Sequence, residues 1–133
     1  MTTPFLCVFF AWLLIFAPKI PLSVAMAKAP GGYDNKHPRD QQDRLTGWAA
    51  RAKAAHLNGF ESFPPFAAGV VIAHLAGLDP YRASLLAITF VVARALYPVL
   101  YILDLDYLRS GVWGVGLLAT AGLYLLPWLA PAT

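Results

Sequence analysis

Four apolar stretches, each long enough to cross a lipid bilayer, constrain this chain more than any other feature of its sequence. They cover residues 4–27, 54–77, 81–103 and 111–129. A membrane helix needs about 20 mostly apolar residues to cross roughly 30 Å of hydrocarbon. Because 59% of the 133 residues are hydrophobic, the chain carries more apolar surface than a soluble domain of this size could bury. We therefore expect one all-α membrane domain, a bundle of four transmembrane helices.

The distribution of basic residues predicts how this bundle is oriented. Six of them lie between the first two apolar stretches, and Arg109 lies between the last two. These two connections share one side of the membrane, whereas Arg82 is the only basic residue in the connection on the opposite side. Basic loops stay in the cytoplasm, so we expect a cytoplasmic loop and both termini on the non-cytoplasmic side. The expected loop covers residues 28–45, and the expected helices cover about 4–27, 46–77, 81–103 and 110–130.

A cluster of polar residues at the start of the second apolar stretch is the first candidate site. Arg51, Asn58 and Glu61 follow one another at steps of seven and three residues, which places them on roughly one helix face. Polar groups inside a membrane are costly and usually mark function. Pro64 and Pro65 directly follow the cluster and remove two backbone donors. We therefore expect a kink at the same place.

The third apolar stretch carries a second polar face. Arg94, Tyr97 and Tyr101 are spaced by three and four residues, so they also share one helix face. An arginine keeps its proton under all ordinary conditions, and a buried one requires an anionic partner. Glu61 is the only acidic residue in the second stretch. We predict that Glu61 and Arg94 contact each other between these two helices.

Several classes of protein are excluded because their motifs are missing. The sequence has no glycine-rich phosphate loop, no set of Cys and His residues with metal-ligand spacing, and no H-x-E zinc signature. The single cysteine, Cys7, lies in an apolar stretch and cannot form an intrachain disulfide. We expect no metal site and no nucleic-acid partner. The expected partner is the lipid bilayer.

Two motifs together resemble the MAPEG family, the membrane-associated proteins in eicosanoid and glutathione metabolism. The first is R-x-x-x-A-H-x-N-x-x-E-x-x-P-x-F over residues 51–66, and the second is R-x-x-Y-x-x-x-Y over residues 94–101. The resemblance covers about residues 1–130. It implies a homotrimer of four-helix protomers that binds glutathione as a co-substrate at each subunit interface, near the cytoplasmic side. The short, simplified pattern is similar to bacterial members, which implies a bacterial inner-membrane protein.

The resemblance also implies roles for individual residues. Glu61 would hold the amino group of glutathione, and Arg109 would stabilise its thiolate, or Ser110 if the two patterns are offset by one residue. The implied thiolate set is Tyr101, Arg109 and Ser110. The implied glutathione-binding set is Arg51, Asn58, Glu61, Arg94 and Tyr97.

One position departs from the family pattern and keeps three functions open. Ala54 stands where glutathione-using members carry a second arginine that contacts a glutathione carboxylate. The first function is a glutathione-dependent transferase or peroxidase acting on a lipophilic electrophile from the bilayer. The second is a non-catalytic trimer in which Glu61, Arg94 and Asn58 form a structural network. The third is a protein that binds or transports another amphipathic anion without chemistry.

Overall fold

The chain folds entirely into helices, as a computed structural model covering residues 1–129 shows. Helices make up 82% of residues 1–129 and no strand occurs among them, which confirms the all-α class. The expected end of the last helix at residue 130 lies outside these residues. The helices are α1 (Thr3–Phe16), α2 (Lys19–Lys28), α3 (Pro38–Asp43), α4 (Gly47–Leu75), α5 (Pro80–Ile102) and α6 (Asp106–Leu129).

Three helical segments are long and apolar enough to cross a membrane. They are Thr3–Lys28, which joins α1 and α2, Pro80–Ile102 and Asp106–Leu129. Their length and apolar composition are those of membrane-spanning helices. Helix α4 has 29 residues but is not one of the three, because charged and polar residues, among them Asn58 and Glu61 of the predicted site, lower its hydropathy. The helix that departs from the apolar pattern is therefore the one that carries most of the polar cluster.

The first apolar stretch is divided into two helices near its middle. Pro18 has no backbone N–H, and the N–H of Ala17 turns to the carbonyl of Leu14 at 3.3 Å. On the neighbouring helix, Nδ1 of His56 lies 2.7 Å from the carbonyl oxygen of Ile15. A polar side chain of α4 thus supports the backbone where α1 ends.

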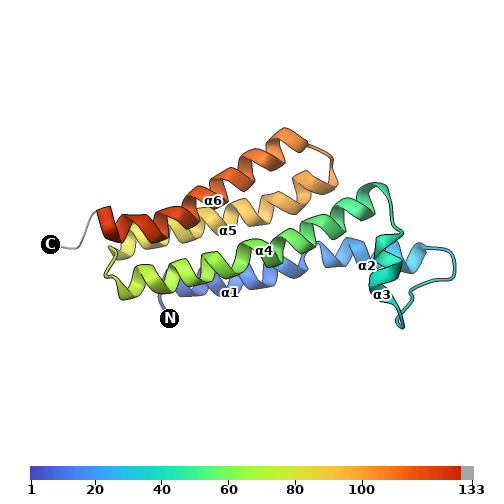
Figure 1. Cartoon of the computed structure of the whole chain (residues 1–133), viewed down its shortest axis with the longest axis horizontal. Helices are drawn as coiled ribbons and strands as arrows, with labels where there is room; N and C mark the ends of the chain where they lie inside the picture. The colour runs from blue at the N-terminus through green and yellow to red at the C-terminus, as the bar shows by residue number, and fades with distance from the viewer. Residues whose placement is uncertain (130–133) are drawn as a thin grey trace.

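Helices α4 and α5 form the centre of the arrangement (Figure 1). Helix α1 packs against both of them, α6 packs against both of them, and α2 packs against α4. Helices α1 and α6 make no contact with each other within residues 1–129. The start of α1, the α4–α5 turn and the end of α6 lie at one end of the molecule, and α3 lies at the other (Figure 1).

The end of the molecule near the α4–α5 turn holds the main core. Phe66 of α4 and Phe90 of α5 are buried and stack with their ring centres 3.8 Å apart. Gly69 allows Tyr124 of α6 to approach closely, since a Cβ atom there would lie 2.8 Å from the tyrosine ring. The Tyr124 hydroxyl donates to the carbonyl of Pro65 at 2.7 Å. Helix α4 continues through both prolines to Leu75, and α6 supplies a donor beside them.

The connection between α2 and α4 is ordered by one buried amide. The Gln41 side chain, 5% exposed, donates to the carbonyls of Met26 at 3.1 Å and Gly32 at 2.8 Å. It also accepts from the N–H of Asp34 at 2.9 Å. The loop expected over residues 28–45 therefore contains a short helix, α3, and has a fixed path. Helix α3 packs on α2 and α4 and touches neither α5 nor α6 in the described structure.

Candidate functional site

A cleft of about 230 Å³ opens between α4, α5 and α6, and its two walls differ in chemistry. Asn58 and Glu61 of α4 and Arg94 of α5 provide the polar wall. The opposite wall is mainly apolar and consists of Phe90 of α5 with Trp113 and Leu117 of α6. A ligand that fits here has a charged or polar part and an apolar part.

The polar wall is a relay of hydrogen bonds rather than an ion pair. The buried Arg94 side chain donates from Nη1 to Oδ1 of Asn58 at 2.9 Å. Asn58 in turn donates from Nδ2 to Oε2 of Glu61 at 3.1 Å. The predicted direct contact between Glu61 and Arg94 is wrong, since no such ion pair forms in residues 1–129. Asn58 lies one helical turn before Glu61, and its amide offers an acceptor to the guanidinium and a donor to the carboxylate.

This relay leaves the Glu61 carboxylate available. Glu61 is exposed and Asn58 is half-buried, whereas Arg94 is only 8% exposed. Because the carboxylate is not consumed by the arginine, one of its oxygens can bind a cationic group of a ligand.

A second cleft of about 230 Å³ adjoins the first and is lined by Tyr97, Tyr101, Arg109, Ser110 and Trp113. Trp113 belongs to both clefts. The Tyr97 and Tyr101 rings meet edge to face, with centres 5.6 Å apart. The guanidinium of Arg109 lies over the Tyr101 ring at 4.4 Å from its centre.

The two clefts are connected by a continuous series of cations and aromatic rings. At the end nearer the first cleft, the Arg94 guanidinium lies 4.3 Å from the centre of the Tyr97 ring. Each cation over a ring is attracted to its electron-rich face. The series therefore runs from Arg94 through Tyr97 and Tyr101 to Arg109, along one side of α5 and onto α6.

Seven of the eight residues predicted for the site line these two clefts, and Arg51 does not. The Arg51 guanidinium donates from Nε and Nη2 to the carbonyl of Ile102, at 3.2 and 3.1 Å. Its Nε also lies 4.0 Å from Oδ1 of Asp104. Arg51 thus binds the carbonyl of the last residue of α5, where a helix end carries partial negative charge. Within this protomer it supports the end of a helix.

Sequence reasoning placed Arg109 and Ser110 of α6 in the site but missed the residues that follow them on this helix. Trp113 is 45% exposed and forms the wall shared by both clefts. Thr120 lines the first cleft, and its hydroxyl donates to the carbonyl of Gly116 at 3.0 Å. One signal in the sequence could have identified Trp113: it follows Arg109 by four residues, so the two share a helix face.

The chain was compared with models of protein families, with curated proteins and with solved structures. The model described as "MAPEG family" matches residues 3–129 of the 133. Neither a curated protein nor a solved structure matches the chain.

Proposed function

This chain belongs to the MAPEG family, and from that premise we propose that it binds glutathione in the two linked clefts and transfers it to lipophilic electrophiles. The observation that carries this proposal is the series of charges and rings along the clefts. Glu61 offers one unoccupied carboxylate oxygen at one end and Arg109 offers a guanidinium at the other. Arg94 and Tyr101 are seven residues apart on α5, which corresponds to about 10 Å of helix. A short peptide with an ammonium group and a carboxylate matches these dimensions.

The chemical step requires the sulfur as a thiolate. The thiol gives its proton to water, and the sulfur then forms a bond to the electrophilic carbon while a leaving group departs with its electron pair. Arg109 stabilises the negative sulfur, and the hydroxyls of Ser110 and Tyr101 are the neighbouring donors. The apolar wall at Trp113 and Leu117 takes the lipophilic partner, which enters from the bilayer.

Assembly and orientation complete the proposal. The protein is a homotrimer of four-helix protomers in a bacterial inner membrane, with the α2–α4 connection in the cytoplasm and both termini on the opposite side. The uneven distribution of basic residues supports this orientation. The polar character of α4 supports the trimer, because neighbouring protomers would shield its polar residues from lipid.

A titration of detergent-solubilised protein with glutathione tests the proposal. We expect heat of binding in calorimetry and thiolate absorbance near neutral pH. Arg109→Leu should remove most of the thiolate signal, whereas Arg82→Leu, which changes the basic residue at the opposite end, should retain it. Ala54→Arg should tighten binding by about 1–3 kcal/mol through a charge-assisted hydrogen bond. An absence of binding in both the wild type and Ala54→Arg would reject the transferase.

A second candidate function is a non-catalytic trimer with a structural network. It is favoured by the contacts of Arg94, which is buried and already held by Asn58 and the Tyr97 ring without a ligand. In that case Arg94→Met should weaken the assembly while glutathione has no effect on its stability. Binding without turnover of an electrophile would instead favour a carrier of amphipathic anions.

A further inference from the structure

The connection between α2 and α4 presents four basic side chains that the fold itself does not use. Between residues 28 and 53 there are six basic and three acidic residues. Arg51 binds the end of α5, and Lys53 pairs with Asp43. The remaining four are exposed and form no ion pair in the part of the chain that the structure describes. They are Lys28, Lys36, Arg39 and Arg44.

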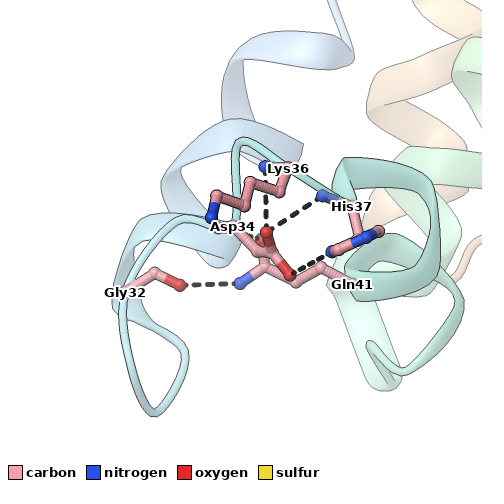
Figure 2. A network of polar contacts seen from close by, with 5 residues as sticks. All are labelled: Gly32, Asp34, Lys36, His37 and Gln41. Carbon is pink, nitrogen blue, oxygen red and sulfur yellow. Dashed lines mark hydrogen bonds and ion pairs between the residues drawn. The ribbon is translucent and has the colours of Figure 1, made fainter.

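The acidic residues of this connection are largely occupied by the protein. The Asp34 carboxylate accepts hydrogen bonds from the N–H groups of Lys36 and His37, both at 3.0 Å (Figure 2). Asp43 is paired with Lys53. Only Asp40 remains exposed without a hydrogen bond or ion pair among residues 1–129. The positive charge of the surface is therefore not neutralised internally.

The backbone that carries these cations has a fixed path. Gln41 ties the loop to the end of α2 through the carbonyl of Met26. It also donates to the carbonyl of Gly32, as Figure 2 shows. Asp34 fixes the following turn through its two backbone donors. A surface that is already ordered loses less conformational entropy when it binds a ligand than a flexible loop would lose.

The depth of this surface follows from the contact between Arg51 and Ile102. That contact places the last residue of α5 level with Arg51 of α4. Helix α5 has 23 residues, or about 34 Å, which already covers the roughly 30 Å hydrocarbon layer. The first residues of α4 and the α2–α4 connection therefore lie at the level of the lipid headgroups. Trp48 and Tyr33, 43% and 42% exposed, are aromatic residues of the kind found at that level.

We propose that Lys28, Lys36, Arg39 and Arg44 form a preorganised binding surface for anionic phospholipid headgroups. Phosphate oxygens are the natural partners of unpaired lysine and arginine side chains at this depth. The opposite end of the molecule has no comparable group of basic residues, since Arg82 stands alone there. The surface lies on the end of α2, on α3 and on the connections before and after α3. Helix α3 contacts neither α5 nor α6 in the described structure, so the proposal is independent of glutathione binding.

The test measures lipid selectivity of the full-length protein in vesicles. Phosphatidylglycerol is mixed into phosphatidylcholine, and the association of each spin-labelled lipid with the protein is compared at low and high salt. We expect the wild type to prefer phosphatidylglycerol, with a preference that falls as salt rises. The triple variant Lys36→Gln, Arg39→Gln, Arg44→Gln should lose most of this preference. Each cation removed near the surface should lower the association constant for phosphatidylglycerol by about fivefold.

Matched controls separate this surface from general charge effects. Arg82→Gln removes one exposed cation at the other end and should leave the preference unchanged. Equal association of both lipids with the wild type, or a triple variant that keeps the wild-type preference, would overturn the proposal. Displacement of phosphatidylglycerol by millimolar inorganic phosphate would also overturn it, because it would identify a site for soluble anions. All variants change exposed side chains, so we expect them to fold normally. Circular dichroism checks this, because the helical signal should equal that of the wild type.

Discussion

The three helices α4, α5 and α6 pack tightly in one half of their length and leave clefts in the other half. Near the α4–α5 turn, Phe66, Phe90 and Leu123 pack tightly, and Gly69 lets α6 approach α4 closely. Towards the α5–α6 turn, the same helices separate enough to leave the two clefts at Asn58 and Trp113. The packed half is lined by apolar side chains, whereas the clefts are lined partly by polar and charged ones. The packed half fixes the helices, and the open half can therefore keep a cavity without collapsing.

The largest effect should come from a cavity in the packed half. Phe66 is fully buried, so Phe66→Ala should lower the free energy of unfolding by about 3 kcal/mol or more, because neither water nor lipid refills a closed core. Leu117→Ala is the control in the open half, where the side chain is 52% exposed, and it should change this energy by less than about 0.5 kcal/mol. Denaturation in mixed micelles measures both. Equal losses would mean that the two halves do not differ in packing.

An intermediate effect should appear inside the open half, in double-mutant cycles. Asn58→Ala combined with Arg94→Met should show a coupling energy of about 1.5–3 kcal/mol, the range of a hydrogen bond to a charged group. Glu61→Gln combined with Arg94→Met should show a smaller coupling, because Asn58 stands between the two. Thermal unfolding of the single and double variants supplies the energies. A larger coupling for Glu61 than for Asn58 would contradict the relay.

The smallest effect should lie outside both halves, in the α2–α4 connection. The N–H of His37, together with that of Lys36, holds the pKa of the Asp34 carboxyl below its usual value. A lowered pKa in the folded state stabilises the loop at pH values above the unfolded pKa, and this contribution disappears as the pH falls through the folded value. The protection factors of the Lys36 and His37 amides in hydrogen exchange should therefore fall only below about pH 4.

A variant checks the origin of this acid sensitivity. Asp34→Asn removes the carboxylate and should make the protection factors of these two amides lower and nearly independent of pH in the acidic range. Asp40→Asn is the control, since Asp40 accepts no hydrogen bond from the backbone in residues 1–129. Acid sensitivity that persists in Asp34→Asn would assign it to another group.

The sequence predicted the features that depend on local spacing. Membrane-length apolar stretches indicated the long helices, and spacings of three and four residues placed Arg94, Tyr97 and Tyr101 on one face of α5, where the structure has them. The partner of Arg94 was not predictable in this way. The choice between Asn58 and Glu61 depends on how α4 is rotated against α5, and both residues lie on the same side of α4.

Other features depend on contacts between distant segments. Arg51 reaches Ile102, 51 positions later in the chain, so its helix-capping role leaves no trace in local spacing. Gln41 orders its loop through Met26, 15 positions earlier. The polar, turn-forming sequence of this loop is typical of an irregular connection. Nothing in the sequence distinguishes the one buried glutamine that orders the loop from an exposed glutamine.

The separation of α1 from α6 has a consequence for how copies of this chain can associate. The two helices lie on different edges of the central α4–α5 pair and do not touch within residues 1–129. An interface that joins the α1 edge of one copy to the α6 edge of the next is head-to-tail, since the two surfaces differ. Such contacts either close around a rotation axis or continue as a filament. In the plane of a membrane, the rotation from one copy to the next would alone set the number of subunits in the closed ring.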